Sequence, residues 1–276
     1  MPELSDEKLQ FLQDMARRVR RHVVETISNA QVGHPGGSLS ETDILVALFF
    51  HVLRVDPQRP KWEDRDRFIL SKGHGAVGLY STLAERGYFP VDLLRTFGRF
   101  ESGLQVHPDM HKLPGIEISS GALGVGLSAA LGMALAARLD GKSFRVYCVI
   151  GDGENQEGQI WEAAAAAAQF KVDNLTAILD YNRVQLTGPM EKIIELAPIA
   201  AKWRDFNWEV LEIDGHDMRA VVGALERAQQ VKGRPTMIVA HTVKGKGVSY
   251  MEGQYMWHGK PPNKEQLAQA LAELAG

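Results

Sequence analysis

The segment 144–170, FRVYCVIGDGENQEGQIWEAAAAAAQF, decides the fold of this chain. Its first part, FRVYCVI, is mostly apolar, which predicts a strand buried on both faces. The glycines of GDGE predict a tight turn, and QIWEAAAAAAQF predicts a helix. A strand that leads through a glycine turn into a helix is the repeating unit of parallel sheets covered by helices.

The same alternation continues on both sides of this unit. Further strands are predicted at 67–71, 175–181, 208–214 and 236–242. Helices are predicted at about 5–30, 42–53, 76–87, 126–139, 198–206, 218–230 and 264–276. The first helix has Ser5 as its predicted N-cap, and the second has Ser40 or Thr42. This order indicates the α/β fold class, with a mostly parallel sheet flanked by helices, and no linker or repeat divides the single domain predicted over 1–276.

Composition excludes several classes of partner. Lys and Arg number 31 and Asp and Glu number 34, so the formal net charge of −3 gives no reason to expect nucleic acid or an anionic membrane. The N-terminal stretch is charged throughout, and no apolar run is long enough to span a bilayer. Because Cys148 is the single cysteine, an internal disulfide is excluded. We therefore expect a cytoplasmic protein.

Polar residues follow two of the predicted strands. Asp152 lies in the Gly-Asp-Gly turn after strand 144–150, and Asn182 follows strand 175–181. The carboxyl ends of parallel strands meet at one edge of the sheet, where such folds bind ligands. One carboxylate and one amide oxygen at that edge suit a hard divalent cation that bridges to phosphates. Gly-Asp-Gly alone is also ordinary turn chemistry, so the later asparagine carries most of this prediction.

Two other phosphate-binding motifs are incomplete. Gly141-Lys142-Ser143 has the end of a Walker A loop, but position 136 is alanine and a strand follows the segment rather than precedes it. Residues 124–129 match G-x-G-x-x-[GA], yet no strong strand precedes them and no acidic residue ends a following strand. A nicotinamide-type dinucleotide site is therefore not expected.

Four histidines stand in loops marked by glycine or proline. They are His34, His74, His107 and His258. Neutral imidazoles orient sugar hydroxyls, donate to phosphate oxygens and transfer protons near neutral pH. Each histidine taken alone is more often structural, whereas four of them in turn-like segments favour a site. No H-x-x-x-H or C-x-x-C pairing accompanies them, so a zinc site is not expected.

Two stretches are rich in small residues, the six alanines 163–168 and the segment 126–139. Helices of this kind allow a close approach on every side. Tight packing against the sheet within the chain and packing against a second subunit are equally good interpretations.

The motifs of the chain, taken together, resemble those of a known family. The GDG turn with its later asparagine resembles the thiamine diphosphate and Mg²⁺ motif of thiamine-dependent enzymes, and the surrounding segments resemble transketolase. They occur in the family's order from about residue 10 to 260, and they read GHPGGSLS, ILSKGHGAVGLY, HPDMHKLPGIEISSGALGVGLSAALGMA, IGDGENQEGQIWEA, DYNRVQLTG and HTVKGKGVSYME followed by WHG. The resemblance covers the diphosphate-binding half of a transketolase, without its pyrimidine-binding and C-terminal domains.

The resemblance implies a metal and cofactor site. The Asp152 carboxylate, the Asn182 side chain and the backbone carbonyl of Val184 would ligate Mg²⁺, with Ca²⁺ as the alternative metal. Gly153 and the amide of Gly124 would contact the diphosphate of thiamine diphosphate. These are expectations carried over from matching positions.

The resemblance also implies roles for the histidines and for two glutamates. His74 and His258 would lie against the diphosphate or the substrate, and His34 and His107 would hold hydroxyls of the donor sugar. Two further acidic residues would lie near a subunit interface and link two active sites, namely Glu157 and Glu162. Their other interpretation is as carboxylates that stabilise the first turns of a helix. A phosphate contact is the most that we expect of Lys244 and Lys246.

The implied function is that of the N-terminal subunit of a split, two-subunit transketolase. Such an enzyme transfers a two-carbon ketol unit from a ketose phosphate to an aldose phosphate, here in the pentose phosphate pathway. The expected partner is a separate C-terminal subunit that carries the pyrimidine domain and the glutamate that activates the cofactor, in an assembly of two copies of each. Alternatives are a thiamine diphosphate-dependent split enzyme for another sugar, a sugar sulfonate or a 2-oxoacid, and a non-catalytic cofactor-binding partner.

Overall fold

The computed structural model describes residues 4–275 and contains a five-stranded parallel sheet. Its strands are β1 Arg67–Leu70, β2 Val146–Gly151, β3 Leu175–Tyr181, β4 Glu209–Asp214 and β5 Thr236–His241. Their order across the sheet is β1-β2-β3-β5-β4, and every neighbouring pair is parallel. The predicted fold class is confirmed. Positions 1–3 and 276 of the predicted single domain lie outside the described residues.

Helices flank the sheet on both faces. They are α1 Asp6–Ala30, α2 Pro35–Ser40, α3 Thr42–Ala47, α4 Ala76–Arg86, α5 Val125–Leu139, α6 Gly158–Gln169, α7 Ile199–Asp205, α8 Met218–Gln230 and α9 Lys264–Glu273. Short 3₁₀ turns lie at 73–75, 91–96, 153–156, 190–192 and 255–258. The predicted N-cap of α1 is confirmed, since the Ser5 hydroxyl oxygen accepts the Lys8 N–H at 3.2 Å.

The helix predicted over 42–53 is found over 42–52, but its N-cap is Glu41 rather than Ser40 or Thr42, and a helix that was not predicted precedes it. Pro35 starts a separate helix, α2, and the chain turns at Glu41 before α3 begins. Ser40 does not cap α3, because its hydroxyl donates to the carbonyl of Gly37 and to the carboxylate of Asp180. After α3 the helix widens to a π-helical turn at Leu48–Val52.

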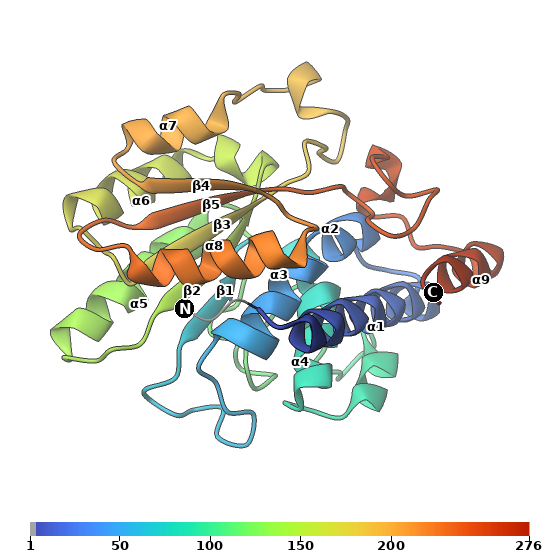
Figure 1. Ribbon diagram of the computed structural model, residues 1–276. Coiled ribbons are helices and arrows are strands. Elements are labelled where there is room, and N and C mark those ends of the chain that lie inside the picture. The colour runs from blue at the N-terminus through green and yellow to red at the C-terminus, as the bar shows by residue number, and fades with distance from the viewer. Residues whose placement is uncertain (1–3, 276) are drawn as a thin grey trace.

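The sheet separates two apolar cores. Side chains of α1, α3, α4 and α8 pack on one face, and those of α5, α6 and α7 pack on the other. Figure 1 shows how these helices surround the sheet. Alternate residues of β2 serve the two cores, with Tyr147 and Val149 on the first face and Cys148 and Ile150 on the second. A strand covered on both faces needs apolar residues at every position. The continuous apolar run 146–150 therefore predicts a central strand.

The alanine-rich helices α5 and α6 bury several of their alanines in the second core. Ala134, Ala164 and Ala167 are fully buried in the second core, and the Trp208 indole N–H donates to the carbonyl of Ala164 at 3.0 Å. Internal packing accounts for this face of both helices. Among the described residues no helix combines the length and apolarity that crossing a membrane requires.

Candidate active site

The carboxyl ends of β1, β2, β3 and β5 surround a cavity of about 290 Å³. Several residues singled out from the sequence line it, namely His74, Asp152, Gly153, Glu157, Asn182, Val184 and His258. They come from segments that are far apart in the chain, and the parallel register brings them to one edge, since Gly151 pairs with Asp180. The predicted meeting of the two strand ends is therefore found.

Asp152 is a buried carboxylate at the floor of this cavity, with 5% of its surface exposed. Its oxygens accept hydrogen bonds from the backbone N–H of Gly153 at 2.7 Å and of Arg183. Burial, together with the nearby Asp180 carboxylate, raises the pKa of Asp152 to about 6. Because burial disfavours the ionised form of Asp152, a cation placed beside the carboxylate would stabilise it.

The donor set around Asp152 fits a hard divalent cation. Asn182 offers its Oδ1, which accepts the Val184 N–H at 3.1 Å, and Val184 offers its carbonyl. That carbonyl accepts a hydrogen bond from Lys244 Nζ at 3.0 Å, so a positive charge already lies against it. A carboxylate, an amide oxygen and a carbonyl are the ligands that Mg²⁺ and Ca²⁺ prefer, with phosphate oxygens completing the shell.

The four loop histidines form one cluster. The ring centroid of His34 lies 5.6 Å from that of His74, 5.9 Å from that of His107 and 5.5 Å from that of His258. The rings of His74 and His258 are 5.0 Å apart. Such a meeting of residues from four separate loops is not expected of isolated structural histidines, so their joint appearance favours a site.

Three rings of the cluster, those of His34, His74 and His258, are held neutral at pH 7. Burial, with His107 and Lys244 nearby, lowers the pKa of His34 to about 4. Burial and Lys244 lower the pKa of His258 to about 3, and burial with Lys72 lowers that of His74 well below its usual value. Neutral imidazoles act as paired donors and acceptors rather than as cations. The cluster therefore suits hydroxyl recognition and proton transfer.

The predicted contact of the Gly124 amide with a diphosphate stays a prediction, and in this structure the amide has a partner within the chain. The Gly124 N–H donates to Glu154 Oε1 at 2.8 Å, and Gly124 does not line the cavity. Leu123, one residue earlier, lines it instead. The reason is that Gly124 is the N-cap of α5 with a left-handed φ of 85°, which turns its amide inward.

The two glutamates of α6 occupy exposed positions. Glu157 is the N-cap residue of α6 and lines the cavity, but its side chain makes no capping hydrogen bond. Glu162 is exposed further along the helix and does not line the cavity. Helix-end stabilisation does not account for Glu162, which lies outside the first turn.

Several cavity residues were not predicted as site residues, and they include Lys72, Leu123, Glu154 and Gln185, whereas Lys244, of which a phosphate contact was expected, also lines the cavity. Lys72 Nζ is buried between the carboxylates of Glu41 and Asp180. Glu41 in turn packs so closely on Gly75 that a Cβ there would overlap its carboxylate. From sequence alone, lysine and glutamate are expected at the surface, and only the fold reveals that Lys72 and Glu41 are buried.

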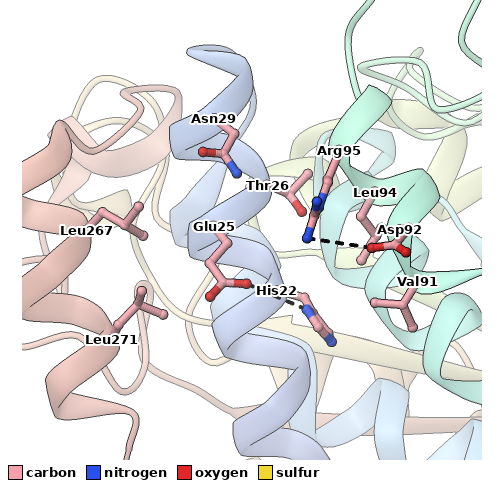
Figure 2. A pocket seen from close by; sticks show the side chains of 10 residues that line it. All are labelled: His22, Glu25, Thr26, Asn29, Val91, Asp92, Leu94, Arg95, Leu267 and Leu271. Atoms are coloured by element: carbon pink, nitrogen blue, oxygen red, sulfur yellow. Dashed lines mark ion pairs between the residues drawn. The ribbon is translucent and has the colours of Figure 1, made fainter.

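A larger cavity of about 510 Å³ lies elsewhere, between α1, the turn 91–96 and α9. Figure 2 shows Leu267 and Leu271 of α9 on one side of α1 and the paired Arg95 and Asp92 of the turn on its other side. Its charged groups pair locally, with Arg95 3.6 Å from Asp92 and His22 3.8 Å from Glu25. No residue singled out from the sequence lines it, so it is not the candidate active site.

Residues 12–275 match the protein family described as transketolase, thiamine diphosphate binding domain. The chain belongs to the transketolase family. This match confirms the resemblance stated from the motifs and identifies the domain as the thiamine diphosphate-binding one. It also confirms an enzyme of the transketolase type, a transferase.

Relatives of nearly the same length are subunits of transketolases. The chain is 46% identical over 263 residues to the 6-deoxy-6-sulfo-D-fructose transketolase subunit SqwG of Clostridium sp. (strain MSTE9), covering 95% of this chain and 96% of that protein. It is 41% identical over 268 residues to one subunit of the apulose-4-phosphate transketolase of Phocaeicola vulgatus, covering 97% of this chain and 95% of that protein.

Longer transketolases match over part of their length. The transketolase of Homo sapiens is 39% identical over 269 residues, which cover 97% of this chain and 42% of the human protein. The crystal structure of transketolase from Campylobacter jejuni superposes with a TM-score of 0.91 at 33% identity, covering 96% of this chain and 43% of that chain. The chain thus corresponds to less than half of these transketolases.

Proposed function

We propose that this chain is the N-terminal, thiamine diphosphate-binding subunit of a two-subunit transketolase. It would transfer a two-carbon ketol unit from a ketose phosphate to an aldose phosphate, in the pentose phosphate pathway. The observation that carries the proposal is a cavity lined by the imidazoles of His74 and His258 beside the oxygen donors of Asp152 and Asn182. The ring of His34 adjoins both of these imidazoles, and the ring of His107 adjoins that of His34. That combination serves a cofactor diphosphate and a polyhydroxylated substrate together.

The metal and the cofactor would be held at the strand ends. Asp152, the Asn182 side chain and the Val184 carbonyl would ligate Mg²⁺ or Ca²⁺, and Gly153 would lie against the diphosphate. Lys244, which is buried and whose pKa burial lowers to about 8, would neutralise a phosphate oxygen. When bound, thiamine diphosphate supplies the carbon nucleophile and electron sink for carbon–carbon bond cleavage.

The histidines would handle the sugar. His34 and His107 would orient donor hydroxyls, and His74 and His258 would lie against the diphosphate or the reacting end of the substrate. His34 Nδ1 is buried and has no hydrogen-bond partner among residues 4–275. A substrate hydroxyl would satisfy that nitrogen. Because the rings of His34, His74 and His258 are neutral, each offers one hydrogen-bond donor and one acceptor to substrate hydroxyls.

A partner subunit would complete the site. Relatives of the same length are named as subunits, and apolar side chains are exposed beside the cavity, among them Leu123 at 38% and Leu186 at 62%. We propose that the partner carries the pyrimidine domain and that two copies of each chain assemble in the cytoplasm. Glu157 and Glu162, both exposed, would then face the interface and link two active sites.

A second candidate keeps the reaction and changes the donor. The two relatives of equal length are named for 6-deoxy-6-sulfofructose and for apulose 4-phosphate rather than for a pentose phosphate enzyme. Their names favour a specialised ketose as donor for this chain too. A 2-oxoacid would use fewer of the histidines. A non-catalytic role would leave the complete set of metal donors and imidazoles without a purpose.

The test is ketol transfer by the purified chain, with and without the partner subunit, which we would seek in the adjacent reading frame. Xylulose 5-phosphate, 6-deoxy-6-sulfofructose and apulose 4-phosphate would be compared as donors, with ribose 5-phosphate or glyceraldehyde 3-phosphate as acceptor. We expect turnover only in the mixture, and light scattering should give a mass of two copies of each chain. Full turnover by this chain alone would rule out the split enzyme, and turnover of one specialised donor only would favour the second candidate.

A further inference from the structure

Glu154 is a buried carboxylate with an unusual set of neighbours. It lies two residues beyond Asp152 in the turn after β2, and 2% of its surface is exposed. Its Oε1 accepts the N–H of Gly124 at 2.8 Å and the hydroxyl hydrogen of Ser71. Its Oε2 accepts the N–H of Gly151 at 2.9 Å.

These three donors belong to three separate segments. Ser71 directly follows β1, Gly151 ends β2, and Gly124 is the N-cap of α5. One side chain therefore ties two adjacent strand ends to the loop before α5. Gly151, Leu123 and Glu154 itself all line the cavity, so the tied segments form part of its wall.

The hydrogen bonds require an acceptor oxygen at both Oε1 and Oε2. Two of the donors are backbone amides, which cannot turn round to accept, and each needs an oxygen lone pair. In a glutamine at this position, the amide group would face one of these N–H groups with its own N–H₂. Burial raises the pKa of Glu154, and its hydrogen bonds from Ser71, Gly124 and Gly151 oppose that shift.

The geometry points to Glu154 as a positioning residue that holds the loop 121–124 and the Gly151–Gly153 turn in the arrangement that receives the diphosphate of thiamine diphosphate. The inference rests on the proposed function. Glu154 acts through the backbone of Gly124 and Gly151 and touches no reacting atom. Gly124 has a φ of 85°, and Gly121 has one of 149°. Such a glycine-rich loop has many conformations open to it unless it is anchored.

The test compares Glu154→Gln with the wild-type chain and with Glu191→Gln, an exposed glutamate that loses the same charge. Thiamine diphosphate affinity is measured by calorimetry at saturating Mg²⁺ in the complex with the partner subunit. Amide exchange of segment 119–127 is measured by mass spectrometry in the cofactor-free chain. We expect Glu154→Gln to weaken affinity by about 10- to 100-fold, as for a lost hydrogen bond to a charged group. Exchange should accelerate in 119–127, and Glu191→Gln should match the wild type.

Ser71→Ala provides a milder variant, because it removes one donor and leaves both amides bound to Glu154. It should weaken affinity by about 3-fold, and it carries the test if Glu154→Gln fails to fold. Unchanged affinity and exchange in whichever variant folds would overturn the inference. Weaker affinity with unchanged exchange would also overturn it, since Glu154 would then act on the cofactor directly. A wild-type complex that binds no thiamine diphosphate would overturn the proposed function itself, and this inference with it.

Discussion

Lys72 Nζ lies 2.6 Å from Asp180 Oδ2 in the fully buried interior, and 2.7 Å from Glu41 Oε2 on its other side. The same ammonium donates to the carbonyl of Gly37 at 3.1 Å. One positive charge therefore lies between two buried acidic groups, Glu41 at α3's N-cap, whose pKa burial raises to about 8, and the Asp180 carboxylate of β3. Lys72 lies two residues before His74, so these buried contacts hold the segment that carries His74 in place.

Lys72→Met should destabilise the fold strongly. The variant leaves the Asp180 carboxylate buried beside Glu41 without a counter-charge, and breaking a buried ion pair costs about 3–5 kcal/mol in free energy of unfolding. The loss should shrink as pH falls, because Asp180 of the variant then takes up a proton. Urea denaturation at pH 7 and pH 5 measures both effects.

Lys142→Met is the matched control, since Lys142 pairs with Asp64 on the surface at 2.8 Å and with 33% of its side chain exposed. It should leave the urea midpoint unchanged. If Lys72→Met behaved like this control, the buried cluster would have no part in stability.

Alanine variants of His34 and His107 should separate catalysis from folding. If these imidazoles hold substrate hydroxyls, each variant should keep its thermal midpoint and most of its cofactor affinity, yet lose turnover by about 10²–10⁴-fold in the complex. His51→Ala is the control, because His51 pairs with Glu226 at 3.0 Å, away from the cluster. Wild-type rates in the His34 and His107 variants would show that both histidines have only a structural role.

The buried imidazoles also predict a loss of stability in acid. The pKa of His34 is about 4 and that of His258 about 3, against 6.5 for the exposed side chain. Below pH 6.5 the unfolded chain therefore binds more protons than the folded one. The contribution of these groups to the free energy of unfolding is constant above pH 6.5 and falls as the pH decreases towards 4.

The measurement is the free energy of unfolding of the wild type and of a His34→Gln/His258→Gln variant from pH 7 to pH 5. The variant should lose less stability over this interval, because glutamine does not titrate. Identical slopes for the two proteins would contradict the lowered pKa of both rings.

The sheet, the strand-end residues of the site and its loop histidines can be predicted from local sequence patterns. The apolar run 146–150 and the alternation of strands with helices identify a parallel sheet, and the carboxyl-end rule then brings Asp152 and Asn182 together. Glycine and proline mark the loops of the histidines. These signals lie within a few residues of the groups they identify, and so they can be read before the structure is known.

The supporting residues could not be found in that way. Ser71 and Glu154 are 83 positions apart, and Lys72 and Asp180 are 108 apart. Whether a lysine or glutamate is buried depends on partners supplied by other segments, about which local periodicity carries no information. The division of segment 35–53 into two helices and a π-helical turn was missed for a related reason, since the Ser40 hydroxyl also donates to Asp180 on a distant strand.

The last prediction concerns the metal. Asp152 is the one carboxylate in the proposed ligand set, and neutral oxygens alone bind a divalent cation weakly. Asp152→Ala should therefore abolish Mg²⁺-dependent binding of thiamine diphosphate in calorimetry, as chelation of divalent ions should in the wild type. The fold should survive, because the substitution removes a carboxylate whose burial is unfavourable, as its raised pKa of about 6 indicates. Asp92→Ala, on an exposed turn, is the control. Unchanged affinity in Asp152→Ala would remove the metal site from this edge of the sheet.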